Sequence, residues 1–167
     1  MSNIAIDAFN EKYHQNIISL ILDIQQKEFG IEITIEDQPD LANIKDFYLK
    51  EQGNFWFARC GDEVVGTIAL LDIDEKFLAL RKMFVKEAFR GQPYNAALKL
   101  LKTAIQWAEQ YNKQAIYLGT TSKFLAAQRF YEKNNFVKVE KENLPQAFPV
   151  MKVDSVFYRY NICNENK

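Results

Sequence analysis

The segment from residue 81 to residue 101, RKMFVKEAFRGQPYNAALKLL, contains residues that are suited to bind an anion. Residues 83–85 form a short apolar run that predicts a strand. This strand leads through Arg90 and Gly91 into a helix that we expect to open at Pro93. Such a turn points backbone N–H groups, and the positive end of a helix dipole, at the space above it. Anions bind at such turns, and pyrophosphate does so readily. The alternative is an ordinary strand-to-helix turn with a surface arginine.

The side chains of this loop refine the prediction. Arg90 can give a phosphate oxygen a charge-assisted contact, and Gly91 lets the backbone approach a ligand closely. Pro93 has no N–H to donate but suits a first helical turn. The side chain of Asn95 must point away from a ligand or contact it. The candidate anion-binding residues are Arg90, Gly91, Gln92, Pro93, Tyr94 and Asn95.

The composition excludes several classes of function. Lys plus Arg number 21 against 22 for Asp plus Glu, so the net charge is -1 and no basic surface for nucleic acid is expected. Cys60 and Cys163 form no CxxC pair, and His14 is the single histidine, so we expect no metal site. The N-terminus resembles no signal peptide, and no apolar run is long enough to cross a membrane. The cysteine usage predicts a soluble cytoplasmic protein.

The hydrophobic pattern predicts one α/β (α+β) domain over residues 1–167, without repeats or linkers. Strands are expected at 3–9, 54–60, 64–73, 77–85, 115–119, 136–140 and 153–162. Helices are expected at 11–29, 41–50, 93–110 and 122–134. These elements predict a mixed central sheet of about six to seven strands flanked by about four helices. One face of the last strand could pair two copies into a homodimer, although a core face would look the same.

A second segment carries a resemblance to a known family. Residues 130–136, FYEKNNF, end a predicted helix and lead into a strand, as the segment Leu/Phe-Tyr-Glu-Lys-x-Gly-Phe does in the GNAT superfamily of N-acetyltransferases. The loop at Arg90 is similar to the Gln/Arg-x-x-Gly-x-Gly/Ala loop of that family, with Pro93 and Asn95 at two of its glycine positions. Together with the element order over most of the chain, these residues resemble a bacterial-type GNAT subgroup.

The resemblance implies that the loop binds acetyl-CoA as a co-substrate. It also implies that the strand before the loop offers its backbone to the pantetheine arm, through Met83, Phe84 and Val85. Many relatives have an asparagine early in the later helix to hold the cofactor, and Phe124 falls near that position here. A plain buried strand would show the same side chains.

The resemblance also implies that Tyr131 is the general acid. When an amine displaces CoA from its thioester, a thiolate leaves and needs a proton. A phenol, with a pKa of about 10, stays protonated at neutral pH and can donate to that thiolate. The alternative interpretation makes Tyr131 an aromatic core residue of an amphipathic helix.

The general base and the acceptor pocket are less defined. The acids between the first two helices lie in a segment that resembles a GNAT subgroup. Members of this subgroup share the motifs Glu-Phe-Gly, Glu-Asp-Gln-Pro-Asp and Leu-Pro-x-x-Phe-Pro-x-Met-x-Val-Asp. Among these acids, Glu28 is our candidate base. Each of these acids could equally be a solvated surface residue. Arg81 and Lys82 are consecutive on one strand, so we expect their side chains on opposite faces. One of them could hold a substrate carboxylate.

These expectations combine into an acetyl-CoA-dependent N-acetyltransferase. Its acceptor would be a primary amine of a small molecule or peptide, which attacks directly in a ternary complex. The alternatives are an acyl-CoA-binding sensor module that has lost turnover, and a structural domain without affinity for CoA.

Overall fold

A computed structural model describes residues 3–162 as a seven-stranded mixed sheet with the strand order β1-β2-β3-β4-β5-β7-β6. Cys163 lies outside these residues. The strands are β1 (Ile4–Ala8), β2 (Asn54–Cys60), β3 (Glu63–Asp72), β4 (Phe77–Val85), β5 (Ala115–Thr120), β6 (Val137–Val139) and β7 (Val156–Asn161). The helices are α1 (His14–Asp23), α2 (Pro39–Ala42), α3 (Ile44–Tyr48), α4 (Ala96–Gln110) and α5 (Leu125–Lys133). Short 3-10 turns and one π-helical segment join them: η1 (Glu11–Tyr13), η2 (Ile24–Glu28, the π segment), η3 (Glu87–Phe89) and η4 (Lys141–Asn143).

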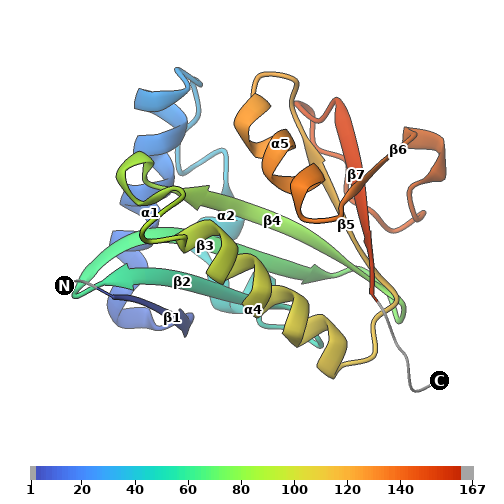
Figure 1. Cartoon of the computed structure of the whole chain (residues 1–167), viewed down its shortest axis with the longest axis horizontal. Coiled ribbons are helices and arrows are strands. Elements are labelled where there is room, and N and C mark those ends of the chain that lie inside the picture. Colours follow the sequence, from blue (N-terminus) through green and yellow to red (C-terminus); the bar gives the residue numbers. More distant parts are fainter. Residues whose placement is uncertain (1–2, 163–167) are drawn as a thin grey trace.

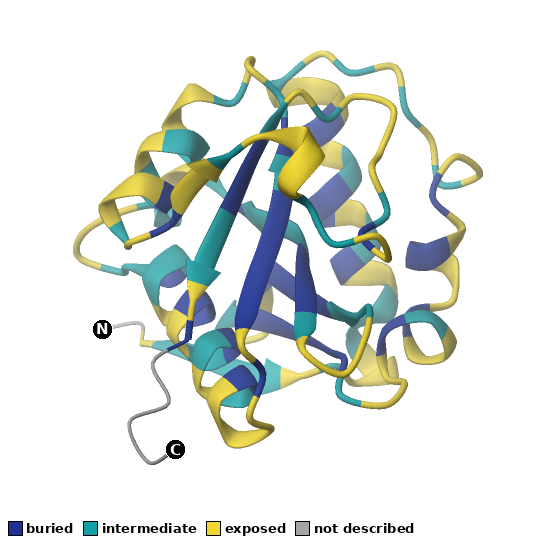
Figure 2. Cartoon of the chain, turned by 90° about the vertical axis from the view of Figure 1, so that its right-hand side faces the viewer, coloured by how far each residue is buried: buried dark blue, intermediate teal, exposed yellow. Residues whose placement is uncertain are grey.

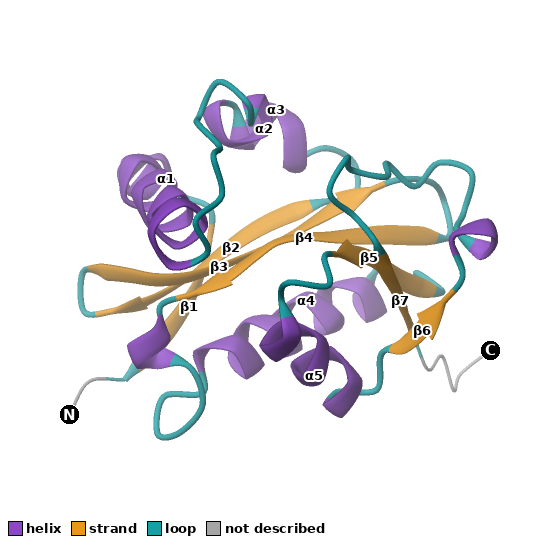
Figure 3. Ribbon diagram, turned by 90° about the horizontal axis from the view of Figure 1, so that it is seen from above, coloured by secondary structure: helices purple, strands orange, loops and turns teal. Residues whose placement is uncertain are grey.

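The helices cover both faces of the sheet. Helices α1, α2 and α3 lie on one face, and α4 and α5 lie on the other (Figures 1 and 3). The predicted α/β class with a mixed sheet is confirmed. All strand pairs are antiparallel except β4 with β5, so the parallel crossover passes through α4 as expected.

The alternation of side chains along β3 builds a core on each face. Ile68 and Leu70 point into the cluster under α4, whereas Ala69 between them points into the cluster under α1. Because both faces of the sheet are covered, β3 is almost continuously apolar. The central strands are accordingly the most deeply buried elements (Figure 2). The face of β7 that carries Tyr158 belongs to the core under α4, since Tyr158 is fully buried.

A bulge interrupts the pairing of β4 with β3. Thr67 is opposite Phe84 and Ala69 is opposite Arg81, which leaves two residues of β4 facing one of β3. Lys82 adopts a left-handed backbone with φ 54°, and Thr67 Oγ1 donates a hydrogen bond of 2.7 Å to its carbonyl. The bulge breaks the strict alternation of the strand. The expectation that Arg81 and Lys82 point to opposite faces is therefore wrong, because both side chains reach Asp40.

Strands β4 and β5 separate soon after they pair. Their parallel ladder runs only from Phe77 opposite Ala115 to Ala79 opposite Tyr117. Beyond this point the two strands diverge like the arms of a V (Figure 1). The remainder of β4 is hydrogen-bonded to β3 alone within the described sheet. The sheet therefore opens between β4 and β5, at the strand that precedes the candidate anion loop.

Two helices begin later than expected. Helix α4 begins at Ala96 rather than Pro93, because the left-handed backbone of Asn95 (φ 50°) is incompatible with a helical residue at that position. Helix α5 begins at Leu125, with Phe124 at its N-cap. At the other end of α5, Asn135 adopts φ 74°, at the position where the segment of the GNAT family has a glycine.

Candidate active site

The candidate anion loop joins β4 to α4 and folds around two left-handed residues. Gly91 has φ 64° and Asn95 has φ 50°. The Asn95 amide donates to the Gly91 carbonyl over 2.7 Å, and the Arg90 amide donates to Glu87. The first amides of α4 have no partner within the helix, since no turn precedes them. The fifteen-residue α4 therefore presents N–H groups at this loop. The amides of Arg90 and Asn95 are already hydrogen-bonded within the loop and are not available to a ligand.

Arg90 is held by a carboxylate on the other side of the loop. Its Nη1 and Nη2 donate to the two oxygens of Glu28, each over 2.6 Å, and its Nε donates to the Val85 carbonyl over 2.8 Å. The structure thus joins the predicted phosphate-binding arginine to the predicted base. Both oxygens of Glu28 are occupied by the guanidinium.

Phe124 also has a partner from the end of the first helical region. Its ring lies against Phe29, with 4.6 Å between the ring centroids. Phe29 directly follows η2, and Phe124 directly precedes α5, so elements from opposite faces of the sheet touch here. Met83 packs against the core under α4, and Phe84 packs against the core under α1.

Tyr131 lies on α5 and is 5% exposed, in the core on the α4 face. Its ring packs against Phe130, Phe136 and Tyr158. Burial, and secondarily Tyr158, raises the pKa of the Tyr131 phenol above its ordinary value of 10.0. Among residues 3–162 the hydroxyl makes no hydrogen bond, yet every fully buried side-chain polar atom there has a partner. The Tyr131 hydroxyl is therefore reached by solvent.

A cluster of charged and polar side chains lies on the opposite face, near α2 and α3. We call Asp40, Tyr48, Arg81 and Lys82 the acceptor-face cluster. Oδ2 of the buried Asp40 accepts a 2.5 Å hydrogen bond from the Tyr48 hydroxyl and lies 3.4 Å from Lys82 Nζ and 3.9 Å from Arg81 Nη2. Lys82 Nζ also donates to Gln38 over 2.7 Å.

The two cations of the cluster differ in their surroundings. Lys82 has close oxygen partners, and burial lowers the pKa of its ammonium. Arg81 lies over the rings of Phe47 and Tyr48 and donates to Met151 Sδ at 3.7 Å. Within the described part of the chain, the Arg81 guanidinium has no oxygen partner at hydrogen-bond distance. It is 15% exposed, so it can offer several donors to an anion.

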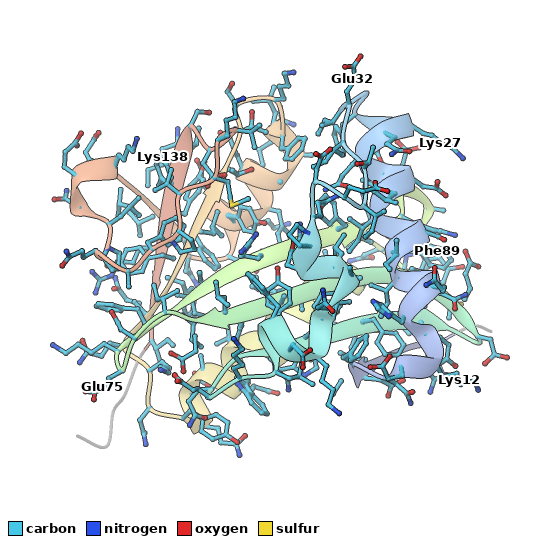
Figure 4. The ribbon with its side chains drawn as sticks, turned by 180° about the vertical axis from the view of Figure 1, so that it is seen from behind. Lys12, Lys27, Glu32, Glu75, Phe89 and Lys138 are labelled. Atoms are coloured by element: carbon cyan, nitrogen blue, oxygen red, sulfur yellow. The ribbon has the colours of Figure 1, made fainter. Side chains whose placement is uncertain are left out.

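The remaining acids of the predicted acceptor side lie elsewhere. Asp37 accepts hydrogen bonds from the backbone and the hydroxyl of Thr34. Glu32 projects away from the molecule at the tip of the loop after η2 (Figure 4), and Glu36 is exposed. Asp40 and Asp154 were missed as site residues, although each ends a segment that signalled the subgroup. Their positions in space depend on the paths of the loops, which the sequence pattern does not predict.

The fold agrees with comparisons to known proteins. The model of the acetyltransferase (GNAT) family matches residues 18–136. The chain belongs to this family. An acetyltransferase of the GNAT family from Staphylococcus aureus Mu50 is 41% identical, with a TM-score of 0.90 over 96% of this chain and 99% of that one.

More distant GNAT relatives are similar over different shares of their length. N-acetylaspartate synthetase of Danio rerio is 36% identical over 102 residues, which make up 60% of this chain and 36% of that protein. This chain thus spans about a third of the length of that relative. A GNAT acetyltransferase of Elizabethkingia anophelis with acetyl-CoA bound shares the fold, at 20% identity, with a TM-score of 0.62 over 95% of this chain and 98% of that one.

Two absences hold for the described residues 3–162. No helix in this range is both long and apolar enough to cross a membrane. No group of three or more His, Cys, Asp or Glu side chains within it is arranged to hold a metal ion.

Proposed function

We propose that this GNAT protein transfers an acetyl group from acetyl-CoA to a primary amine of a small molecule or peptide. The observation that carries the proposal is the opening between β4 and β5 beyond Ala79 and Tyr117. Tyr131 lies on one face of the sheet, and the acceptor-face cluster lies on the other. An acetyl group held in this opening is accessible to an amine from one face and to a phenol from the other.

The loop between β4 and α4 is the proposed site for the pyrophosphate of acetyl-CoA. Gly91 and Asn95 turn the backbone there, and the first amides of α4 supply donors. Arg90 would supply a positive charge by exchanging its contact with Glu28 for a phosphate oxygen. The relative from E. anophelis that has acetyl-CoA bound supports this choice of co-substrate.

The acceptor is proposed to carry a carboxylate beside its amine. Arg81 offers guanidinium donors without a close oxygen partner in the described chain, and such a group suits a bidentate carboxylate. The relative N-acetylaspartate synthetase, by its name, forms an acetylated amino acid. Lys82 is less available, because Gln38 and Asp40 already occupy it.

Direct attack by the amine fits the residues better than a covalent acyl-enzyme does. Cys60 pairs with Ile4 on β1, and β1 lies at the far edge of the sheet from β5. Tyr131 is proposed to assist the departing thiolate. A phenol with a raised pKa remains protonated at neutral pH, so it donates a hydrogen bond to sulfur as negative charge develops there.

Thermal unfolding with and without acetyl-CoA tests the co-substrate. At about 100 times its dissociation constant, a ligand stabilises the folded protein by roughly 2.7 kcal/mol, which for this size raises Tm by several degrees. Acetylation of L-aspartate, L-alanine and ethylamine then tests the acceptor. A shift with turnover supports the proposal, and a shift without turnover on a broad amine panel would favour an acyl-CoA-binding module. No shift at millimolar acetyl-CoA would contradict both.

The contact between Glu28 and Arg90 leads to a separate prediction for the affinity for acetyl-CoA. Glu28→Gln should lower the Kd for acetyl-CoA about three- to tenfold, because the variant removes a negative charge and frees the arginine for phosphate. Isothermal titration calorimetry measures this change. Glu32→Gln makes the same change of charge at an exposed site and should leave Kd unchanged.

The same variant examines the expectation that Glu28 is the base. If Glu28 accepts the proton of the amine, Glu28→Gln will lower kcat by a factor of about 100 or more and leave Kd unchanged. A lower Kd with kcat nearly unchanged would assign Glu28 to Arg90 instead.

A further inference from the structure

Asp154 lies where the opening between β4 and β5 meets the acceptor face. A side chain built on Gly119 of β5 would place its Cβ 2.5 Å from Asp154 Oδ2, so the carboxylate rests directly on the Gly119 backbone. Gly119 lies two residues beyond Tyr117, the last residue of β5 that pairs with β4. Extending that register places Gly119 opposite Arg81 across the opening.

A tight turn fixes the position of this carboxylate. The Asp154 amide donates to the Met151 carbonyl over 3.0 Å, and the Met151 amide donates back to Asp154 Oδ2 over 2.9 Å. The next residue, Ser155, is tied to β5 by a 2.8 Å bond to the Thr120 carbonyl. Oδ1 of Asp154 makes no hydrogen bond within residues 3–162. One oxygen therefore anchors the side chain, and the other is available to a ligand.

Asp154 and Tyr131 belong to opposite faces of the sheet. Arg81, whose charge acts on Asp154, lies over the rings of α3 residues, whereas Tyr131 packs in the core with α4. A direct transfer needs this arrangement, with a proton acceptor where the amine enters and a proton donor where sulfur leaves.

We propose that Asp154 is the general base that deprotonates the acceptor amine. This inference rests on the proposed acetyl transfer. The carboxylate takes one proton from the acceptor ammonium, and the freed lone pair forms a C–N bond with the thioester carbon. The C–S bond breaks as Tyr131 gives its proton to the sulfur, nitrogen loses its second proton to solvent, and Tyr131 regains a proton from solvent. Asp154 later releases its own proton to water.

The electrostatic surroundings agree with this role. Burial raises the pKa of the Asp154 carboxyl from its ordinary value of 3.8, and the amide of Met151 and the charge of Arg81 oppose that rise. Asp40 forms ion pairs with both Arg81 and Lys82. A carboxylate with a raised pKa is a stronger base, and it is ionised above that pKa.

Other acids near the cleft are less suited to this role. Asp40 Oδ2 already accepts from Tyr48 and pairs with Lys82, and Glu28 lies at the candidate anion loop, where it contacts Arg90, rather than beside Gly119. Asp37 binds Thr34. Among these four acids, Asp154 alone combines an available oxygen with a position beside the opening.

The test is Asp154→Asn, whose side-chain oxygen can still accept from Met151. We expect kcat to fall by a factor of about 100 or more, with KM for the amine within about threefold of wild type. The wild-type kcat should rise with pH as the carboxylate ionises, and this acidic limb should disappear in the variant. A residue that only positioned Arg81 would raise KM and leave the shape of the pH profile unchanged.

Two further variants complete the test. Gly119→Ala keeps the charge but forces the carboxylate aside, so it should also lower kcat. Glu142→Gln removes an exposed acid in η4 and should leave kcat unchanged. All variants are first checked for a thermal shift with acetyl-CoA and then assayed with the twenty amino acids, simple alkylamines and short peptides.

The outcomes separate this inference from the function on which it rests. If wild type acetylates an amine and Asp154→Asn keeps more than about a third of kcat with the same pH profile, the base assignment is overturned. If wild type binds acetyl-CoA but acetylates none of these amines, the transferase proposal itself is overturned, and the base assignment with it.

Discussion

Tyr131→Phe is expected to lower kcat by a factor of about 100 to 10,000 while leaving the affinity for acetyl-CoA unchanged. The variant removes one hydroxyl and keeps the ring, so the packing against Phe136 and Tyr158 is retained. What is lost is the hydrogen bond to the sulfur as the C–S bond breaks. Such an interaction exists only in the transition state and therefore affects kcat.

The pH dependence of the wild type provides an independent measurement. Tyr131 must be neutral to donate, and burial raises its pKa above the ordinary value of 10.0. Activity should therefore show no loss from Tyr131 ionisation up to about pH 10. Steady-state kinetics from pH 6 to pH 10 measure this, within the range where the protein stays folded.

Tyr111→Phe is the matched control. Tyr111 is 37% exposed and stacks on Trp107 at the end of α4, far along the helix from the candidate loop. Removal of its hydroxyl should leave kcat unchanged. If Tyr131→Phe behaves like Tyr111→Phe, Tyr131 is a core aromatic residue, which is the alternative that the sequence left open.

The sequence predicted the architecture well, because the apolar periodicity of each element records which faces are buried. In β3, the alternation of Ile68, Ala69 and Leu70 between two cores follows directly from strand geometry. The turn at Gly91 was likewise predictable, since glycine adopts a left-handed backbone without strain.

The errors arose where tertiary structure overrides local rules. Lys82 in a left-handed conformation shifts the register of β4, and no composition signal marks that bulge. The start of α4 was displaced by the backbone of Asn95. The neighbourhood of Arg81, Gly119 and Asp154 joins residues more than thirty positions apart, and the path of a loop decides it.

Asp40→Asn is expected to destabilise the fold by about 3–5 kcal/mol, the largest effect on stability that we predict. Asn can still accept from the Tyr48 hydroxyl, so the variant mainly removes the negative charge. Arg81 and Lys82, at 15% and 10% side-chain exposure, would then face each other without their shared carboxylate. Two buried like charges without a partner cost more than the lost hydrogen bonds.

Urea unfolding measures this loss as a lower midpoint with an unchanged m-value. Asp46→Asn is the control, because Asp46 is an exposed acid on the adjacent helix α3 and should change the free energy of unfolding by less than about 0.5 kcal/mol. A similarly small change in Asp40→Asn would show that the cluster contributes little to stability.

The pH dependence of Asp40→Asn identifies which cation is responsible. Burial already lowers the pKa of Lys82 from 10.5, and Asp40 opposes that shift. Without Asp40, the unfolded chain binds more protons than the folded one between the lowered pKa and 10.5, so the stability of the variant should rise with pH in that window. Arg81 stays charged throughout. If the variant regains part of its lost stability between pH 7 and pH 9, relative to wild type, the destabilisation is due to Lys82. If the loss in free energy of unfolding is the same at pH 7 and pH 9, it is due to Arg81.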